Sequence, residues 1–517
     1  MAMAAAISAF ALLLFLWPAS VIFFSYFLTP RRIRITMAKQ GVTGPKPRFL
    51  LGNLPDVAAL VSTATAGDMD AGDHNIVGRL LPHYVLWSKI YGKRFVFWYG
   101  SEPRLCLTDT DLIKEFLSAK GVHLSGKSWL QRQGTKHFIG QGLLMANGDQ
   151  WLHQRHVVAP AFMGEKLKSH MGYMIECTKK TMETLRTAAE IAGKNGLVEI
   201  GEHLTRLAGD IIFRTEFDTS YEKGRQIFHH LTRLQSLTAQ SSRHLWIPGS
   251  RFIPSKFRRE IKSLKEEVEK LLMEIIESRR EGVEIGRSSS YGKGLLGLLL
   301  AETTKKETSS YSLQKVMDEC KTFFFAGHET SALLLTWTVM LLATNPAWQE
   351  KARAEVASVC SGEPPAADHL PKLNLLQMII NESLRLYPPA TLLPRMAFED
   401  TKLGDLFVPR GLSIWIPVLA IHHDEEIWGE DAHRFNPARF AARSFAANRH
   451  FLPFAAGPRN CVGQAYAMAE AKIVLAMLLA NFRFAISESY RHAPVNVLTL
   501  RPKYGVPVHL TPVTASS

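Results

Sequence analysis

The stretch FAAGPRNCVG, at residues 454–463, decides the fold of this 517-residue chain. It matches the pattern F-x-x-G-x-R-x-C-x-G at Phe454, Gly457, Arg459, Cys461 and Gly463. An apolar helix is predicted to start at Cys461, where free N–H groups lower the pKa of a thiol. The thiolate can then bind haem iron, the glycines let the backbone approach the porphyrin and the sulfur, and Arg459 can neutralise a propionate. The alternative is a buried structural cysteine in a glycine-rich turn, which the match over the whole stretch disfavours.

This loop resembles the haem-ligand loop of the cytochrome P-450 superfamily, and the resemblance covers essentially the whole chain. It implies a mainly α-helical fold with small β-sheets, built as one large domain, and haem b held by Cys461 as its axial iron ligand. It also implies a haem-thiolate monooxygenase, which inserts one atom of O2 into an unactivated C–H bond. We find no flavin or nicotinamide motif, so electrons from NADPH are expected to arrive through a partner, NADPH–cytochrome P-450 reductase.

A second motif of the family, A-G-x-[DE]-T, occurs at residues 326–330, inside a helix predicted over residues 313–344. Gly327 and Thr330 can disturb the helical hydrogen bonds and open a groove over the haem. The resemblance implies that the Thr330 hydroxyl and the Glu329 carboxylate relay protons to bound oxygen, and that Ala326 borders the substrate. The alternative is a threonine bonded back to its own helix, with Glu329 on the solvent side.

Glu382 and Arg385 have the spacing E-x-x-R, which is common on helices as ordinary charge pairing. The downstream segment FNPARF, at residues 435–440, selects this copy as the family motif. The resemblance implies that Glu382, Arg385 and Arg439 form a buried network that supports the haem loop without taking part in catalysis.

Trp151 and Arg155 match W-x-x-x-R, a spacing that puts both side chains on one face of a helix. The resemblance implies that both reach the haem propionates, and Arg395 is a further propionate candidate. The alternative is an exposed arginine that covers a core tryptophan. The adjacent His422 and His423 are expected to point in different directions, so we interpret them as structural residues and not as metal ligands.

The segment GVHLSGKS, at residues 121–128, fits the phosphate-binding pattern G-x-x-x-x-G-K-[ST]. Such a site needs a buried strand before it and a long helix after it. Residues 111–120 instead predict an amphipathic helix, and Gly134 and Gly140 are expected to interrupt any helix that follows. A nucleotide hydrolase is therefore disfavoured. In the resembling family this region is the variable loop over the substrate pocket, where Lys127 and Arg132 are candidates to contact an anionic substrate.

Composition and charge indicate the class of protein. The chain is 46% apolar and 21% charged, as globular proteins are, and its five scattered cysteines form no C-x-x-C pair. Its formal net charge is +14, but we find no basic stripe interleaved with aromatic residues, so no nucleic-acid partner is expected. A basic surface that faces anionic lipid or an acidic protein fits this charge better.

The N-terminus predicts a membrane anchor. Residues 4–28 are almost wholly apolar and long enough to span a bilayer as a helix. Basic residues follow this run before the first acidic residue, Asp56, which favours a cytosolic catalytic body. We predict an anchor at residues 1–30, a basic, proline-rich linker at 31–50 and the haem-thiolate domain at 51–517, with a single pass through the endoplasmic reticulum membrane. A cleaved signal peptide is the alternative, disfavoured because no basic residue precedes the apolar run.

Helices dominate the rest of the prediction. Hydrophobic periodicity predicts helices over residues 258–280, 295–302, 377–387 and 462–482. Short β-branched or aromatic runs predict strands over residues 94–99 and 412–417. The polar residues 288–290 and 303–310 predict loops.

Two further stretches, HYVLWSKIYGKR at residues 83–94 and QRQGTKHFIGQGLL at residues 131–144, resemble the plant cytokinin trans-hydroxylases. This resemblance implies hydroxylation of the prenyl side chain of isopentenyladenine nucleotides to trans-zeatin forms. The same clan includes gibberellin- and brassinosteroid-modifying enzymes, so another plant hormone or terpenoid is the alternative substrate. A haem-binding protein without turnover is a remote alternative, because it would need neither Thr330 nor Glu329.

Overall fold

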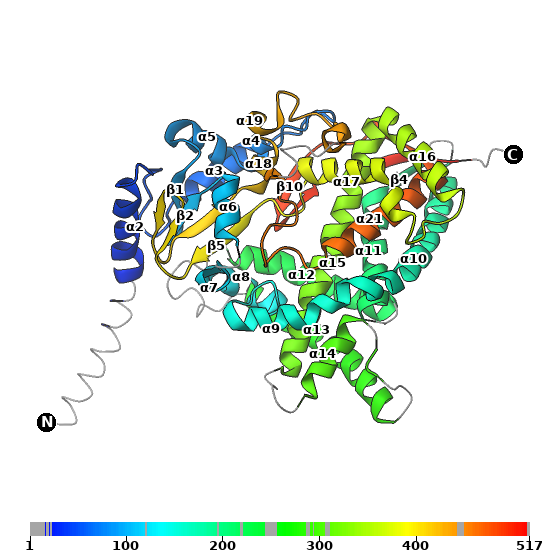
Figure 1. The fold of residues 1–517 in the computed structure, drawn as a ribbon, viewed down its shortest axis with the longest axis horizontal. Helices are drawn as coiled ribbons and strands as arrows, with labels where there is room; N and C mark the ends of the chain where they lie inside the picture. Colours follow the sequence, from blue (N-terminus) through cyan, green and yellow to red (C-terminus); the bar gives the residue numbers. More distant parts are fainter. Residues whose placement is uncertain are drawn as a thin grey trace.

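The structure is a computed structural model of the chain. It describes residues 23–118, 121–193, 196–217, 221–242, 256–285, 290–292, 294–305, 311–441 and 449–513, together with Leu16 and Ser20. Within these residues, helices make up most of the molecule and enclose small sheets on one side (Figure 1). The predicted class, mainly α with small β-sheets, is confirmed for the described residues.

The described helices are α2 (Thr29–Ala38), α3 (Leu54–Ala64), α4 (Val77–Leu80), α5 (Pro82–Tyr91), α6 (Thr110–Phe116), α7 (Gly121–Leu124), α8 (Trp129–Ile139), α9 (Gly148–Val158), α10 (Gly164–Ile191), α11 (Ile200–Glu216), α12 (Tyr221–Ser242), α13 (Lys256–Glu284), α14 (Leu295–Thr303), α15 (Leu313–Thr344), α16 (Pro346–Cys360), α17 (Asn374–Leu386), α18 (Val418–His422), α19 (Glu425–Trp428) and α21 (Gln464–Asn481). The helix predicted over residues 313–344 coincides with α15. The one predicted over 462–482 begins two residues later, because the turn after Cys461 continues to Gly463.

The strands are β1 (Phe95–Tyr99), β2 (Glu102–Cys106), β3 (Ser125–Gly126), β4 (Leu197–Glu199), β5 (Leu393–Ala397), β6 (Thr401–Leu403), β7 (Leu406–Val408), β8 (Ser413–Ile416), β9 (Phe482–Ile486), β10 (Pro494–Val497), β11 (Thr499–Pro502) and β12 (Pro507–Pro512). The largest described sheet has the order β1-β2-β8-β5-β3, in which only the β2–β8 pairing is parallel. The two strands predicted from sequence, β1 and β8, both lie in this sheet.

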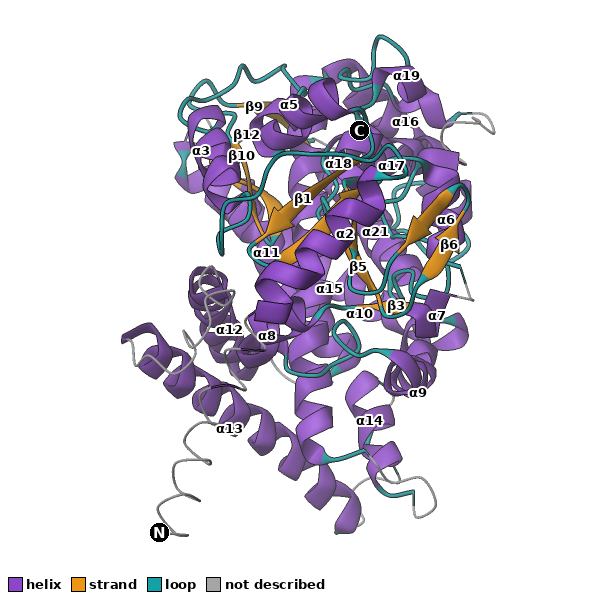
Figure 2. Cartoon of the chain, turned by 90° about the vertical axis from the view of Figure 1, so that its left-hand side faces the viewer, coloured by secondary structure: helices purple, strands orange, loops and turns teal. Residues whose placement is uncertain are grey.

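Helix α2 packs along this sheet (Figure 2). Its residues Ile33 and Met37, one turn apart, are fully buried and belong to the same apolar cluster as Val96 and Leu105 of the sheet. The i, i+4 spacing puts both side chains on one face of the helix. The basic residues of α2 are left on the opposite, exposed faces.

Helix α15 runs through the middle of the helical part and packs against α8, α11, α17 and α21 (Figure 1). Ser312 caps it by accepting the Lys315 N–H, and Asn345 ends it before Pro346. Residues 316–324 are buried on all sides. The charged residues among them have partners, since Lys321 pairs with Asp318 and Glu319 accepts a backbone N–H. Residues 325–328 and Thr330 are only half-buried, so the helix borders an open space at the predicted oxygen-binding motif.

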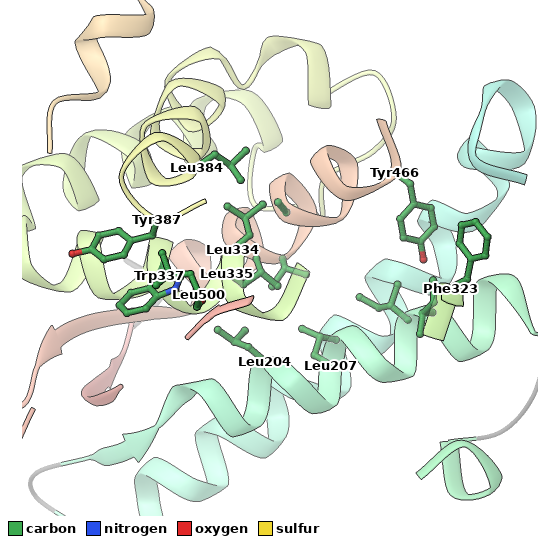
Figure 3. Packing of buried hydrophobic residues seen from close by; sticks show 14 of the residues in the cluster. Leu204, Leu207, Phe323, Leu334, Leu335, Trp337, Leu384, Tyr387, Tyr466 and Leu500 are labelled. Carbon is green, nitrogen blue, oxygen red and sulfur yellow. Dashed lines mark hydrogen bonds between the residues drawn. The ribbon is translucent and has the colours of Figure 1, made fainter. Parts of the chain in front are cut away.

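The core beside α15 is closed by aromatic packing (Figure 3). Trp337 of α15 stacks on Tyr387 with ring centroids 4.3 Å apart. The Trp337 indole N–H donates to Leu500 O at 3.0 Å, so its one polar group is satisfied inside the core. This contact fixes the β10–β11 hairpin against α15, and the same hairpin borders the site described below.

Among the described residues, no helix combines the length and the apolar character needed to cross a bilayer. The predicted membrane helix at residues 4–28 falls mostly outside the described residues, because 1–15, 17–19 and 21–22 are not described. The predicted loops at 288–290 and 303–310 also fall largely outside them.

Candidate active site

The loop that carries Cys461 is closed by its own backbone. The Cys461 N–H donates to Phe454 O at 2.9 Å. Gly457 has φ of +70°, and a Cβ at this position would collide with the carbonyl of Leu117. A side chain at Gly463 would meet only Phe162, at 3.9 Å. Gly457 is therefore needed for the contact with Leu117, and Gly463 keeps the space beside Cys461 open.

Cys461 is an exposed residue, although the protein around it still partly shields its thiol from water. Burial raises the pKa of this thiol, while a backbone N–H of Gly463 and the charge of Arg155 lower it. The prediction of a lowered pKa is thus wrong for the free thiol. Helix α21 begins only at Gln464, so the helix terminus does not outweigh burial.

Arg155 holds the loop in place from α9. Its Nη1 donates to Asn460 O at 2.8 Å and its Nη2 to Asn460 Oδ1 at 2.9 Å. Such a two-point contact fixes both position and orientation. The predicted partner of Arg155 on this helix, Trp151, is buried beneath Arg459, whose guanidinium lies 4.8 Å from the indole ring centre. The helix face predicted from W-x-x-x-R therefore supports the Cys461 loop directly.

Three basic side chains gather beside this loop: Lys127, Arg395 and Arg459. Burial lowers the pKa of the Lys127 ammonium well below its usual value, and Arg395 and Arg459 lower it further. Burial also lowers the pKa of Arg395 to about 10, and burial together with Arg395 lowers that of Arg459 to about 9. Arg459 reaches Ala146 O at 2.6 Å, while the Arg395 Nε has no hydrogen-bond partner among the described residues.

A buried set of cations is stable only beside anions. No carboxylate of the described residues forms an ion pair with Lys127, Arg395 or Arg459. The two propionates of a haem would supply the missing negative charge, and the exposed Cys461 would supply the iron ligand. The residues present therefore fit haem. Lys127, predicted as a substrate contact, lies instead with the propionate candidates.

The A-G-x-E-T motif lies on the half-buried turn of α15. The Thr330 hydroxyl donates to Ala326 O at 2.6 Å, one turn back along the helix. This is the back-bonded arrangement that the sequence left as the alternative. Thr330 is nevertheless only half-buried, so its hydroxyl oxygen can still accept a hydrogen bond from the open side.

Glu329 is buried and held by three donors. Thr499 and Arg501 of β11 both reach Oε1, and the Gln235 amide of α12 donates to Oε2 at 2.9 Å. The alternative that places Glu329 on the solvent side is therefore wrong. The carboxylate joins α12, α15 and β11, and both of its oxygens are in use.

A cavity of about 880 Å³ lies next to this carboxylate. Phe138, Phe228, Phe324 and Phe325 line it with aromatic rings, and polar residues, among them Gln235, Glu329 and Arg501, line it as well. The His328 ring lies against Phe228 in a tilted arrangement, with ring centroids 4.0 Å apart. Burial lowers the pKa of His328 to about 3, so His328 is neutral here. An aromatic cavity with a few polar groups is typical of a small-molecule site. Arg132 is not among the residues that line this cavity.

The E-x-x-R motif forms a closed network. Arg385 donates to both oxygens of Glu382, at 2.7 and 2.8 Å, and all of these groups are fully buried. Arg439 approaches Glu382 Oε1 at 3.4 Å and donates to Trp428 O at 2.8 Å. Asn436 adds its N–H to the same carboxylate at 3.0 Å. The structure thus brings Glu382, Arg385 and Arg439 together between α17 and the segment that leads to the Cys461 loop.

The phosphate-binding pattern does not form a phosphate loop. The first four residues of the pattern form α7, Ser125 and Gly126 belong to β3, and the element before the pattern is helix α6 rather than a buried strand. The Lys127 N–H is taken by Asn147 Oδ1 at 2.8 Å. Helix α8 does follow and passes through Gly134 before ending at Gly140, so the prediction of an early break was wrong on that point.

His422 and His423 are buried and serve the packing. His422 Nε2 accepts the N–H of Leu452 at 2.9 Å, and His423 Nε2 lies 2.9 Å from Leu386 O. Within the part of the chain that the structure describes, no group of three or more His, Cys, Asp and Glu is placed to hold a metal ion. A single axial thiol, as in a haem site, needs no such group.

Gln235, Thr499 and Arg501 belong to the site but carry no sequence signal. Gln235 lies 94 residues from Glu329 along the chain, and Thr499 and Arg501 lie 170 and 172 residues from it. Only the tertiary fold brings them together. The position of Arg501 two residues after Thr499 on β11 puts both side chains on one face of the strand. This alternation points to a contact with Glu329 only when the packing of β11 against α15 is already known.

Comparisons with known proteins agree with this site. A sequence model described as Cytochrome P450 matches residues 78–507. Two proteins of Arabidopsis thaliana, both named "Cytokinin hydroxylase", are 62% identical over 489 and 494 residues, covering 94% and 95% of both chains. "Cytochrome P450 734A6" of Oryza sativa subsp. japonica is 38% identical and covers 94% of this chain and 92% of its own. The chain belongs to the cytochrome P450 family.

Proposed function

We propose that this protein hydroxylates the prenyl side chain of isopentenyladenine-type cytokinin nucleotides to trans-zeatin forms. The observation that carries the proposal is the 62% identity, over nearly the full length of both chains, to two proteins named cytokinin hydroxylase. Rice relatives of the wider family are much less similar, at 38% or below. The substrate assignment therefore rests on similarity to one kind of relative and not on the family as a whole.

The chemistry is that of the family: the protein is a cytochrome P450 monooxygenase that uses haem, O2 and electrons from NADPH delivered by a partner reductase. When bound, the haem supplies the activation of O2 that C–H hydroxylation requires. Cys461 would be its iron ligand, with Phe454, Gly457 and Gly463 shaping the loop. Arg459, Arg395 and Lys127 would neutralise the propionates, and Trp151 and Arg155 would hold Arg459 and the loop.

Residues of α15 would handle protons and position the substrate. The Thr330 hydroxyl, on the half-buried turn, is the group best placed to give or hold a proton at its Oγ1. Glu329 would act only after release from Arg501 or Gln235, because both of its oxygens are engaged. Ala326 lies one turn before Thr330 on the same face of α15 and would border the group to be oxidised, although neither residue is among those that line the cavity.

The cavity suits a ligand with one apolar and one polar end. Its aromatic walls fit a prenyl group or a purine ring, and Arg206 and Arg225 of its lining fit a phosphate, whereas Arg233 is paired with Glu260 and Arg501 with Glu329. Closing such a cavity around the ligand excludes water from the C–H bond under attack.

The protein would work at the endoplasmic reticulum membrane. The apolar run at residues 4–28 supports an anchor at 1–30, followed by the linker at 31–50 and the catalytic domain at 51–517. The catalytic domain would face the cytosol, where NADPH–cytochrome P450 reductase meets its basic surface.

Turnover tests the substrate. Microsomes that contain this protein, a plant reductase and NADPH are given isopentenyladenosine monophosphate, the riboside, the free base, a gibberellin or a brassinosteroid, and mass spectrometry scores the gain of one oxygen. We expect a trans-zeatin nucleotide as the main product. Oxidation of the gibberellin or brassinosteroid without any cytokinin product would overturn the substrate assignment and leave the monooxygenase assignment in place.

A further inference from the structure

Helix α12 lines the cavity beside Glu329 with a row of polar side chains. This helix packs against α8, α11 and α15 (Figure 1). Residues of α12 at intervals of three or four lie on one face of the helix and all line the cavity: Arg225, His229, Thr232 and Ser236. Each of these four side chains has a hydrogen-bond donor. The cavity therefore has a face of donors as well as aromatic rings.

The crossing of α12 with α11 fixes where this row begins. A Cβ on Gly224 would collide with the ring of Phe213 on α11, and one on Gly209 of α11 would lie 2.7 Å from the ring of Phe228. Neither glycine can carry a side chain without a shift of its neighbour. Because the two contacts pair the residues in opposite order, α11 and α12 run antiparallel. Arg225 follows directly after the first of these close contacts.

Four arginines line the cavity, and two of them already bind a carboxylate. Arg501 pairs with Glu329, as described above. Arg233 pairs with Glu260 of α13 at 2.7 Å. A ligand that bound either guanidinium would have to displace its partner.

The other two arginines of the lining differ in their surroundings. Arg206 has an acidic residue one turn away in each direction along α11, Glu202 and Asp210. Burial raises the pKa of the Asp210 carboxyl to about 6, and the charge of Arg206 acts against this. The Arg225 side chain is exposed and, within the part of the chain that the structure describes, takes part in no ion pair and no hydrogen bond. Arg225 is thus the arginine of the lining that is left for a ligand.

The glutamates of the lining do not compete for Arg225. Glu199 uses both of its oxygens to accept three backbone N–H groups, at 2.7 to 3.1 Å. Glu202 lies on the part of α11 before Gly209, and the antiparallel crossing puts that part level with the residues of α12 after Phe228. Glu202 is therefore close to Arg206 and away from the start of the α12 row.

We propose that Arg225, with His229 one turn later, binds the phosphate of the substrate and makes the enzyme select nucleotides over ribosides and free bases. The proposal rests on the proposed hydroxylation of cytokinin nucleotides and assigns its anionic contact to α12. The contact expected at Lys127 and Arg132 does not serve, because Lys127 lies with the propionate candidates and Arg132 does not line the cavity. A guanidinium presents two parallel N–H groups to phosphate oxygens, and an imidazole N–H adds a third donor.

The rest of the lining suits the other parts of a nucleotide. Thr232 and Ser236 offer hydroxyl groups to a ribose, and Phe324 and Phe325 of α15 offer aromatic surface to a purine. From Arg225 onward the row extends over about 16 Å of helix, at about 1.5 Å per residue. A phosphate held at its start leaves this length of the cavity for the ribose, the purine and the prenyl group.

The test uses Arg225→Gln, which removes the charge but keeps much of the side chain. We expect the KM for isopentenyladenosine monophosphate to rise by a factor of about ten, the loss typical of a charge-assisted hydrogen bond. The kcat for the monophosphate and both constants for the free base should change little. Arg225→Lys should recover part of the loss, and His229→Ala should act in the same direction as Arg225→Gln. The matched control is Arg233→Gln, which should keep the selectivity of wild type, because Arg233 lines the same cavity but already binds Glu260.

Equal ratios of kcat/KM for the monophosphate and the free base in Arg225→Gln and wild type would overturn the proposal. A loss of selectivity in Arg206→Gln without one in Arg225→Gln would overturn it as well, since the phosphate would then lie elsewhere in the cavity.

A binding measurement separates this proposal from the cytokinin assignment. The full-length holoprotein is titrated by calorimetry with isopentenyladenosine monophosphate and with isopentenyladenosine, without reductase or NADPH. Tighter binding of the monophosphate by wild type, lost in Arg225→Gln and kept in Arg233→Gln, would support the phosphate site even if another compound proves to be the one oxidised. Equal binding of both compounds by wild type would reject the phosphate site even if the prenyl side chain is hydroxylated.

Discussion

At the scale of single residues, Gly457 is the position with the least freedom in the Cys461 loop. An alanine there would need φ of +70° and would place its Cβ against the Leu117 carbonyl. We expect Gly457→Ala to destabilise the protein by about 3 kcal/mol and to lower its haem content. Gly172→Ala on α10 is the control, because nothing lies within 4 Å of its added methyl group and alanine favours a helix. The thermal midpoint measures the loss of stability, and haem absorbance per protein measures the haem content. Equal effects of Gly457→Ala and Gly172→Ala would contradict this account of the loop.

The roles of Cys461 and Thr330 can be separated by single substitutions. Cys461→Ala should abolish the thiolate form of the reduced, carbon monoxide-bound spectrum, and a retained thiolate spectrum would refute the ligand assignment. Thr330→Ala should keep that spectrum but consume NADPH with less product. Thr338→Ala is the matched control, since its hydroxyl makes the same back-bond, to Leu334 O at 2.7 Å, farther along α15. Equal uncoupling by both threonine variants would show that the back-bond matters and not the position of Thr330.

At the scale of elements, α15 is tied to the loop before α9 by a titrating carboxyl. Glu319 accepts the Leu143 N–H at 2.9 Å and the Tyr311 hydroxyl at 3.3 Å. Burial raises the pKa of Glu319 from 4.5 to about 7. The folded protein then keeps a proton that the unfolded chain releases, so this group lowers stability as pH rises from about 4.5 to about 7, by about 3 kcal/mol in all.

Glu319→Gln should remove this loss. Its thermal midpoint, compared with that of wild type, should rise steadily from about pH 5 to about pH 7, because glutamine does not titrate. Glu281→Gln, at an exposed position of α13, is the control and should follow wild type throughout. A constant difference between Glu319→Gln and wild type over this pH range would exclude the titration of Glu319 as its cause.

Among the elements, some features can be predicted from the local sequence and others cannot. The bounds of α15 follow from its apolar run, the capping Ser312 and the stop at Asn345-Pro346, which are all local signals. The Glu382–Arg385 pair is also local, because an i, i+3 spacing on one helix brings the charges together. The closeness of Lys127 to Arg395 and Arg459 is not visible in the local sequence, because the backbone of Lys127 is held by Asn147, in another loop. The Glu329 contacts with Gln235, Thr499 and Arg501 depend on the packing of three distant elements, which no spacing rule reports.

At the scale of the whole molecule, the net charge of +14 bears on the partner and not on the fold. Attraction between basic residues of this chain and acidic groups of the reductase would act over about a Debye length, which salt shortens to about 3 Å at 1 M. NADPH-driven turnover should therefore fall steeply as sodium chloride rises, with the apparent KM for reductase increasing. The spectrum after chemical reduction is the control, since it needs no docking and should not change with salt. Turnover that is insensitive to salt would argue against electrostatic docking.

The central claim is that this protein inserts one atom of O2 into the prenyl side chain of a cytokinin nucleotide. The most direct test is turnover of isopentenyladenosine monophosphate under 18O2 with reductase and NADPH, followed by mass spectrometry of the product. The account predicts one 18O atom in a trans-zeatin nucleotide, on the prenyl side chain. An oxygen atom derived from water, an oxygen on the purine or ribose, or no oxidised nucleotide at all would contradict it.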